Sequence, residues 1–388
     1  MKKRIFNSLA VVTLAITVTL TSCKEWDFVE ETGELVISGN AAMESKDSIL
    51  PYPYSKYREQ IKKVTIKDGV TAIGNGAFQN CWNMVSITLS GSVIHIGDSA
   101  FVNCWSLASI TLPNSVTHIG EDAFAGCNDI TSIVIGDGIT TIRKEAFCDK
   151  NKLTTVVLGD GIRTIEERAF YNNTELNSVT LGCNVNVIKQ SAFKGCISLT
   201  SITLPNSVTD IGFESFRDCV NLNSVTLSGS LKTIGEGAFR DCVNLSSIII
   251  PEAVKTIGNG AFGGCRSLKS ITLPNSVMTV GDNAFHNCWR LKTVVAGEGV
   301  RTIEWRAFSD NKMMDSITLG RNVTFLGEDA FSHSGVISRF TILNPVPPHI
   351  DHTVFFNTWI TTLYVPRESV GLYRNSEYWN DARNIVGI

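Results

Sequence analysis

The sequence predicts an α/β repeat solenoid dominated by β structure, and three observations support it. A phenylalanine recurs every 23 residues from Phe78 to Phe331 without insertion or deletion, which marks twelve coils. Around each phenylalanine, an apolar residue recurs five positions before it and six, nine, eleven and fifteen positions after it. Serine and threonine alternate with the apolar residues between positions eight and eleven. Only stacked coils keep equivalent side chains aligned over so many repeats, so we expect one continuous array.

Each coil is expected to contain one short strand. From the sixth to the eleventh residue after the phenylalanine the sequence reads Leu-x-x-Ile-x-Leu, whose alternation is typical of a strand with one buried face. Strands of successive coils should pair in parallel on the concave face of the solenoid. Proline stands inside the array only at the twelfth residue, where it ends the pairing (Pro113, Pro205, Pro251 and Pro274).

The stretch around the phenylalanine is expected on the opposite side. It is long enough for only one or two short helical turns. Glycine begins it in eight of the twelve coils, four residues before the phenylalanine. Glycine at such a turn permits either a positive φ or a close approach of neighbouring backbone.

Residues 1–22 are predicted to be an export signal. Residues 2–4 are basic and precede an apolar stretch at residues 5–20, which is too short for a stable transmembrane helix. The stretch ends in Leu-Thr-Ser-Cys, which resembles the lipobox of bacterial lipoproteins. The resemblance implies that Cys23 is acylated and anchors the mature chain in a membrane. The alternative is a plain secretory signal followed by an incidental cysteine.

The repeats also carry a family resemblance. The segments SLASITLPNSVTHIGEDAFAGC and SLTSITLPNSVTDIGFESFRDC resemble the BspA-type (Treponema-type) leucine-rich repeats of bacterial surface proteins. The resemblance covers residues 61–340 and implies a right-handed coil. Residues 23–60 resemble the strand-pair cap that often precedes such arrays, and residues 341–388 resemble their closing segment.

The family resemblance implies a lipid-anchored protein of the cell envelope or cell surface that mediates adhesion or protein–protein interaction. Members of the family are associated with binding host matrix proteins and other bacteria. We therefore expect a monomer held at the outer membrane, with a protein or matrix component as partner. The identity of that partner, and whether the anchor faces the periplasm or the exterior, stay open.

A row of hydroxyl side chains is expected on the exposed face of the sheet. Serine or threonine stands eight residues after the phenylalanine in eleven coils, and threonine stands ten residues after it in eight. Thr111, Thr203 and Thr272 represent this candidate binding face. A flat, uncharged sheet suits an extended peptide or a glycan. The alternative is that hydroxyl side chains simply suit a solvated strand.

Three tryptophans share one position, four residues after the phenylalanine. These are Trp82, Trp105 and Trp289, and the first two belong to adjacent coils. An exposed aromatic platform would stack a sugar ring or contact a protein side chain, which makes glycan binding the second functional hypothesis. The alternative is that each ring only covers the rim of the next coil.

Eight of the eleven cysteines occupy the third position after the phenylalanine (Cys81, Cys104, Cys127, Cys196, Cys219, Cys242, Cys265 and Cys288). We predict buried free thiols that act as small core residues, although stacked neighbours would be close enough for a disulfide. Asparagine replaces cysteine at residues 173 and 311, which argues against metal ligation.

Other polar side chains give no stronger site. His95 and His118 share one repeat position, and His349, Asp351 and His352 lie close together in the sequence, but neither group has the spacing of a metal site. Asp137 and Asp160 stack one coil apart, which favours turn chemistry over a calcium site. We therefore predict neither a metal nor another cofactor.

Charge and motifs argue against two other functional classes. The chain has 34 Lys and Arg against 37 Asp and Glu, a formal net charge of −3, and it has no basic block for nucleic acid. It also lacks the nucleophile elbow, the HExxH motif and the P-loop. We therefore predict an interaction protein rather than an enzyme.

Overall fold

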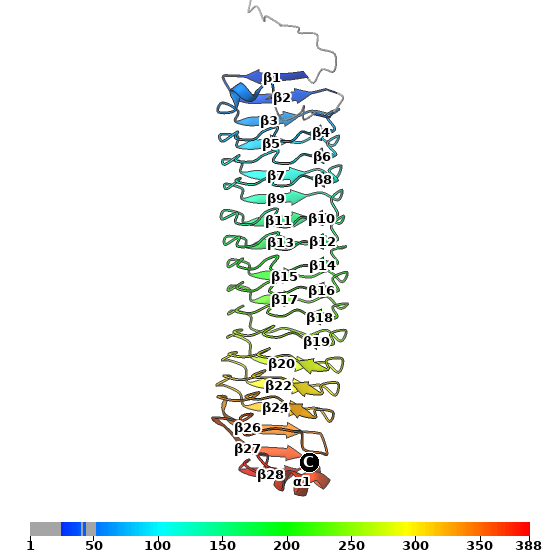
Figure 1. Cartoon of the computed structure of the whole chain (residues 1–388), viewed down its shortest axis with the longest axis vertical. Helices are drawn as coiled ribbons and strands as arrows, with labels where there is room; N and C mark the ends of the chain where they lie inside the picture. Colours follow the sequence, from blue (N-terminus) through cyan, green and yellow to red (C-terminus); the bar gives the residue numbers. More distant parts are fainter. Residues whose placement is uncertain (1–24, 40–41, 44–51) are drawn as a thin grey trace, which may run out of the picture.

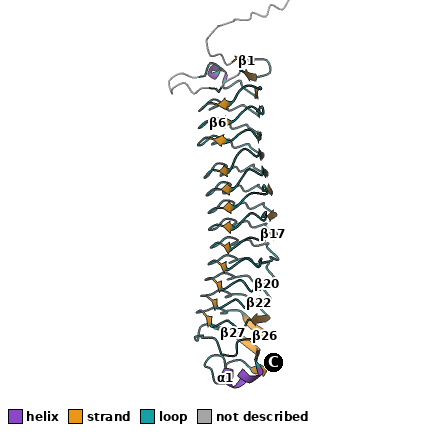
Figure 2. Cartoon of the chain, turned by 90° about the vertical axis from the view of Figure 1, so that its right-hand side faces the viewer, coloured by secondary structure: helices purple, strands orange, loops and turns teal. Residues whose placement is uncertain are grey.

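The structure is a computed structural model that describes residues 25–39, 42–43 and 52–388, so Cys23 and the predicted signal at residues 1–22 lie outside the described residues. The described chain forms a long, nearly straight column of stacked coils (Figure 1). Strands lie on two sides of the column (Figure 2), and we call these two sets the first and the second strand column. The predicted β-dominated solenoid with parallel strands is confirmed.

The first strand column is the sheet that the Leu-x-x-Ile-x-Leu segment predicts. Its strands pair in parallel one coil apart, as Ser109 does with Ser132. Ile110 and Leu112 point into the core, while Ser109 and Thr111 are exposed. The members inside the repeats are β3 (Lys63–Ile66), β5 (Ser86–Thr88), β7 (Ser109–Leu112), β9 (Ser132–Ile135), β11 (Thr155–Leu158), β13 (Ser178–Thr180), β15 (Ser201–Thr203), β17 (Ser224–Thr226), β20 (Ser270–Leu273), β22 (Thr293–Ala296) and β24 (Ser316–Leu319).

This column is interrupted at residues 247–250, in the coil of Phe239. The segment forms no strand, and pairing resumes only at β20. Ile248 and Ile250 stay buried, whereas Ile249 is 85% exposed. Packing of the inward side chains therefore holds this coil in place without the ladder of backbone hydrogen bonds.

The second strand column was not predicted, because a strand of two residues is too short to show an alternation. It consists of the apolar residue five positions before each phenylalanine and the residue that precedes it. The members are β4 (Ala72–Ile73), β6 (His95–Ile96), β8 (His118–Ile119), β10 (Thr141–Ile142), β12 (Thr164–Ile165), β14 (Val187–Ile188), β16 (Asp210–Ile211), β18 (Thr233–Ile234), β19 (Thr256–Ile257), β21 (Thr279–Val280), β23 (Thr302–Ile303) and β25 (Phe325–Leu326). From β10 to β25 it is one uninterrupted sheet.

Further elements extend the first column at both ends. Before the repeats, β1 (Glu25–Val29) and β2 (Glu34–Ser38) form an antiparallel pair, and β2 pairs in parallel with β3. A short 3-10 helix, η1 (Ser55–Tyr57), follows. After β24, the parallel sheet continues through β26 (Gly335–Ile342), β27 (Thr358–Val365) and β28 (Asn384–Gly387), with η2 (Arg367–Ser369) and α1 (Val370–Arg374) between the last two strands. None of the helices in the described ranges has the length and apolar character of a membrane span.

The repeated phenylalanines form one continuous stack of rings through the core. Centroids of successive rings from Phe78 to Phe331 lie 5.1–5.8 Å apart. Tyr54 extends the stack at one end and Phe355 at the other, at 5.8 Å and 5.9 Å. Both are 24 residues from their neighbours. The sequence analysis missed them because the register changes by one residue at each end of the array.

Cysteine at the third position donates to the backbone of the preceding coil. The Sγ of Cys196, for example, donates to the carbonyl oxygen of Phe170 at 3.3 Å. Asn173 makes the equivalent bond to Phe147 at 2.9 Å and a second one to Phe170. All eight cysteines of this position are buried free thiols, as predicted. The position therefore selects for a small donor, which explains why asparagine can replace cysteine.

The glycines that begin each turn are required by close backbone approach rather than by a positive φ. A Cβ atom on Gly120 would lie 2.3 Å from the backbone nitrogen of Asp98, and Gly120 has no positive φ. The left-handed residues stand instead two positions before and two positions after the phenylalanine, as Ser99 (φ 54°) and Asn103 (φ 59°) do. These residues surround the phenylalanine with turns rather than with a continuous helix.

Candidate interaction surface

The two adjacent tryptophans form an exposed aromatic pair. The ring centroids of Trp82 and Trp105 lie 5.6 Å apart with an angle of 18° between the planes. Trp82 is 36% exposed and Trp105 is 50% exposed. Each ring follows a buried cysteine, Cys81 or Cys104, so the backbone beneath the pair is fixed in the core. The stack covers one face of each ring and leaves the ring edges toward solvent.

Trp289 does not join this pair. It lies eight coils beyond Trp105, which corresponds to roughly 38 Å at about 4.8 Å per coil. Its ring is 45% exposed, and the guanidinium of Arg266 lies 4.7 Å from the ring centroid. The three tryptophans that share one repeat position therefore form two separate surfaces.

The predicted hydroxyl residues lie on the outer face of the first strand column. Thr111, Thr203 and Thr272 are all exposed, on β7, β15 and β20. Thr203 pairs with another threonine, Thr226, whereas the partner of Thr111 is a valine. The three threonines are spread over seven coils, so they mark an extended face and not a compact pocket.

Other exposed aromatic residues lie outside the shared repeat position. Trp305 is exposed on the turn before Phe308, and the guanidinium of Arg306 lies 5.1 Å from the centroid of its ring. Trp359 is 63% exposed at the start of β27. It follows Phe355 by four residues, so recognising Phe355 as a member of the ring stack would have found it.

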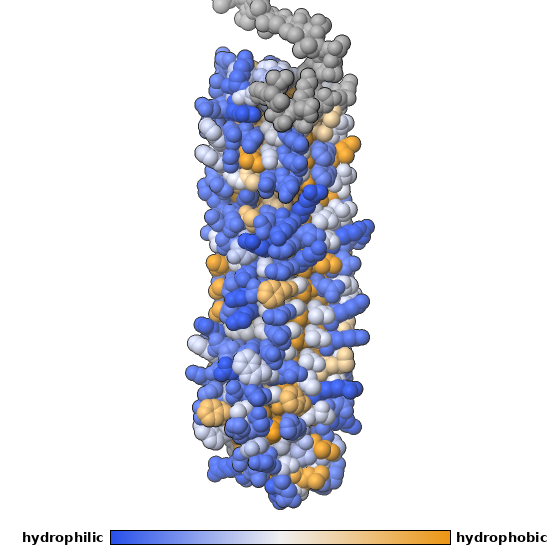
Figure 3. All heavy atoms as spheres, in the orientation of Figure 1, coloured by the Kyte–Doolittle hydropathy of each residue, from blue (hydrophilic) through white to orange (hydrophobic). Residues whose placement is uncertain are grey.

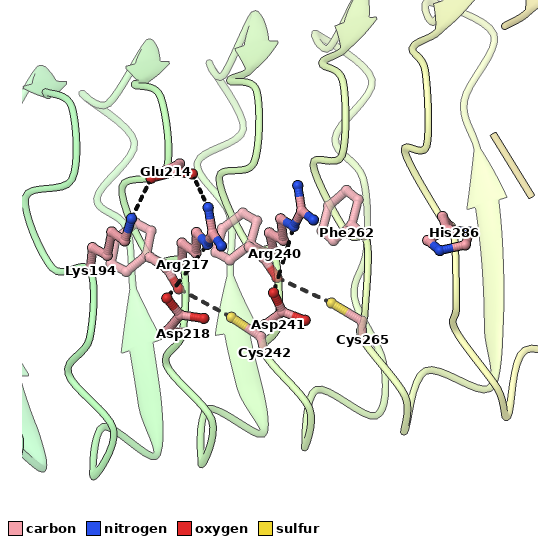
Figure 4. Close-up of polar contacts among 12 residues, drawn as sticks. Lys194, Glu214, Arg217, Asp218, Arg240, Asp241, Cys242, Phe262, Cys265 and His286 are labelled. Carbon is pink, nitrogen blue, oxygen red and sulfur yellow. Dashed lines mark hydrogen bonds and ion pairs between the residues drawn. The ribbon is translucent and has the colours of Figure 1, made fainter. Parts of the chain in front are cut away.

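Charged side chains on the turns pair with one another from coil to coil (Figure 4). Glu214 accepts from Lys194 at 2.6 Å and also pairs with Arg217. Burial alone would raise the pKa of Glu214, but the hydrogen bonds from Lys194 and Arg217 outweigh it and lower the pKa. Further pairs of this kind join Lys189 to Glu166 and Arg168 to Glu145. These charges are neutralised within the column.

The space-filling view shows what remains for a partner on one face of the column. That face is mainly hydrophilic, with hydrophobic side chains in short rows along the long axis (Figure 3). Exposed apolar side chains in the described ranges include Val85 and Ile249. The surface is thus a repetitive scaffold on which a few apolar side chains stand out.

The histidines and aspartates noted in the sequence serve local structure. The rings of His95 and His118 stack with centroids 4.5 Å apart. Asp137 accepts the backbone N–H of Asp160 at 2.8 Å, and Asp160 accepts that of Cys183 at 2.7 Å, which is the predicted turn chemistry. The hydrogen bond from Cys183 lowers the pKa of Asp160. Within residues 25–39, 42–43 and 52–388, no three His, Cys, Asp or Glu side chains gather into a metal-binding group.

Comparison with solved structures places the fold among bacterial leucine-rich repeat proteins. A leucine-rich repeat protein from Bacteroides ovatus is 21% identical with a TM-score of 0.57, and the alignment covers 95% of this chain and 99% of that one. A leucine rich cell surface protein from Faecalibacterium prausnitzii is 24% identical, with a TM-score of 0.33 and coverage of 72% and 94%. A leucine-rich repeat protein from Eubacterium ventriosum is 21% identical, with a TM-score of 0.38 and coverage of 81% and 93%.

Comparison of the sequence with family models identifies the repeat type. No curated protein matches the chain. The model of the BspA type leucine rich repeat region, which comprises six copies, matches residues 48–175, 140–266 and 232–361. Together these matches span more than half of the chain and all twelve of the 23-residue coils. The chain therefore belongs to the BspA-type leucine-rich repeat family.

Proposed function

We propose that the protein is a lipid-anchored, non-catalytic scaffold of the cell surface that mediates adhesion by binding another protein or a matrix component. The family is one of bacterial surface proteins whose repeats act as interaction scaffolds. Anchoring through Cys23 at the outer membrane, and the monomeric state, are part of the proposal and rest on the sequence. The division into a signal (1–22), two caps (23–60 and 341–388) and the array (61–340) belongs to it as well.

The observation that carries the proposal is the exposed pair of Trp82 and Trp105. Exposed aromatic side chains held by a rigid scaffold are typical centres of binding energy in protein interfaces. The two rings cover one face of each other, and Arg266 covers one face of Trp289. A sugar ring needs an open aromatic face, whereas protein side chains also pack well against ring edges. The pair therefore favours a protein partner.

Glycan binding is the second candidate function. It is supported by the large exposed fraction of Trp105 and Trp289, each of which has a second face that no other described ring covers. The exposed threonines of the first strand column would supply hydrogen bonds to sugar hydroxyls.

Protease treatment of intact cells tests the cell-surface proposal. We expect the repeat array to be degraded while a periplasmic marker protein is spared. A Cys23→Ala variant should be released from the membrane fraction. Protection of the array on intact cells would contradict adhesion, and membrane retention of Cys23→Ala would contradict the lipid anchor.

A further inference from the structure

The hydroxyl row on the first strand column ends at an arginine near the C-terminus. By register, Ser316 of β24 pairs with Arg339 of β26, which pairs with Thr362 of β27, which pairs with Asn384 of β28. The other eleven coils have serine or threonine at the position of Arg339. The guanidinium of Arg339 lies 4.1 Å from the ring centroid of Tyr364 on the next strand. The row thus changes from neutral to basic at the C-terminal end of the column.

An open pocket lies beside Tyr364, on the last two strands and the segment that joins them. Its volume is about 510 Å³, within the range of roughly 300–1,000 Å³ that small-molecule sites occupy. The residues that line it include two arginines and no carboxylate. Its polar lining consists of Thr362, Tyr364, Arg374, Asn380, Arg383 and Asn384. In Figure 1 this region is the end of the column that carries β27, β28 and α1.

The positive charge of the pocket is not neutralised by an ion pair. Arg374 donates to the carbonyl oxygen of Ile385 at 3.3 Å, which holds its guanidinium at the edge of β28. Among the described residues, Arg339, Arg374 and Arg383 pair with no carboxylate, whereas Arg168 and Arg321 do so at 2.9 Å and 3.1 Å. Arginines on the repeats thus have acidic partners that the pocket arginines lack.

We propose that this pocket binds a carboxylate-bearing sugar, such as a uronic acid residue of an acidic polysaccharide. A guanidinium matches a carboxylate with two parallel hydrogen bonds, which assigns the acid group to Arg383 and Arg374. The neutral side chains of Thr362, Asn380 and Asn384 donate to and accept from hydroxyl groups. This combination of two forks and several neutral polar groups suits a sugar acid better than an acidic peptide, whose backbone would need a strand edge or a groove. The site is independent of Trp82, Trp105 and Trp289.

Calorimetric titration of the full mature chain with trigalacturonate tests the proposal, with the neutral trisaccharide maltotriose as the matched probe. We expect trigalacturonate to bind, maltotriose not to bind, and the affinity to fall with added salt. Arg383→Ala should weaken binding about tenfold, the effect of losing a hydrogen bond to a charged group. Arg339→Ser, which restores the repeat residue, should also weaken it. Arg301→Ala, an exposed arginine outside the pocket, should leave it unchanged.

Three outcomes would overturn the proposal: equal binding of both trisaccharides, unchanged affinity in Arg383→Ala, or tighter binding of hexaglutamate than of trigalacturonate. Tight binding of sodium sulfate alone would assign the site to a free anion and would likewise overturn it. Thermal unfolding of each variant shows whether the chain still folds, and Arg383→Lys separates loss of charge from loss of the planar fork. Loss of this binding would leave partner capture by the tryptophan pair intact, so the two proposals fail separately.

Discussion

The Sγ of Cys219 donates a hydrogen bond to the carbonyl oxygen of Phe193, 3.2 Å away and one coil earlier. The same oxygen also accepts the backbone N–H of Cys196. We expect Cys219→Ser to keep the donor and to cost less free energy of unfolding than Cys219→Val. The valine variant removes the donor and adds volume to a packed position, which should cost about 1–3 kcal/mol. Urea denaturation measures both variants, and a valine variant as stable as the serine variant would refute the role of the bond.

Alkaline pH should destabilise the column through its buried thiols. Burial raises the pKa of Cys81, Cys196 and Cys288 to about 12 from an ordinary value of 9. Between these values the unfolded chain ionises while the folded chain stays protonated. Stability is therefore full below pH 9 and falls as the pH rises toward 12, by about 1.4 kcal/mol per pH unit for each thiol.

Denaturation midpoints measured between pH 7 and 10.5 check this effect. Replacing Cys196 and Cys288 by serine should make the decline shallower, since serine does not titrate in this range. The exposed Cys183 gives an internal control, because it should react with a thiol reagent in the folded protein while the buried column does not. A decline of unchanged slope in the serine variant would assign alkaline unfolding to other groups.

Glu214 should stabilise the column at neutral pH and lose this effect in acid. Its pKa is lowered from 4.5 in the folded state, so its contribution is present above pH 4.5 and is lost as the pH falls through the lowered value. Glu214→Gln should cost about 1–2 kcal/mol at pH 7, because Lys194 and Arg217 lose a charged acceptor. The matched control Glu145→Gln, whose pair with Arg168 is more exposed, should change stability by less than about 0.5 kcal/mol. An equal loss in both variants would contradict this difference.

The tryptophan pair should discriminate between the two candidate functions. Replacing Trp82 and Trp105 by alanine should abolish capture of a protein partner, while the Trp289→Ala control retains it. Under the glycan hypothesis, replacing all three tryptophans should abolish the signal on a glycan array and leave protein capture intact. Thermal unfolding of the double variant should stay close to that of the parent, since both rings lie outside the core.

Removal of one whole coil should be tolerated, whereas removal of half a coil should not. Residues 217–222 and 240–245 have the same Arg-Asp-Cys-Val-Asn-Leu sequence, so deleting residues 217–239 joins two equivalent turns. The ring of Phe216 would then meet that of Phe262 in the same register. We expect cooperative unfolding at a slightly lower temperature. Deleting only residues 217–228 puts polar residues in the core and should abolish cooperative unfolding, as circular dichroism would show.

The repeat register explains which parts of the fold were predictable from the sequence. Side chains 23 residues apart share one environment, so Phe216 and Cys219 could be placed without coordinates. Tyr54 and Phe355 escaped because one extra residue separates each from the array. The choice between positive φ and close approach at Gly120 needed the position of Asp98 in the preceding coil.

The candidate sites were less predictable, because surfaces depend on contacts between coils. The sequence places Trp82 and Trp105 in adjacent coils, and the structure shows that their rings stack. The C-terminal pocket was not predictable, since Arg339, Arg374 and Arg383 lie outside any repeat and meet only through the pairing of β26, β27 and β28. Its one sequence signal was the arginine that replaces serine at residue 339.

The unpaired segment at residues 247–250 has a mechanical consequence. Around it the second strand column is continuous from β18 through β19 to β21, while the first has no hydrogen-bonded ladder. A bending force on the rod would open the weaker side first, with the other side acting as the hinge. Flexing would then begin at Ile249, so a surface-anchored rod of this kind has a built-in point of compliance two-thirds of the way along the chain.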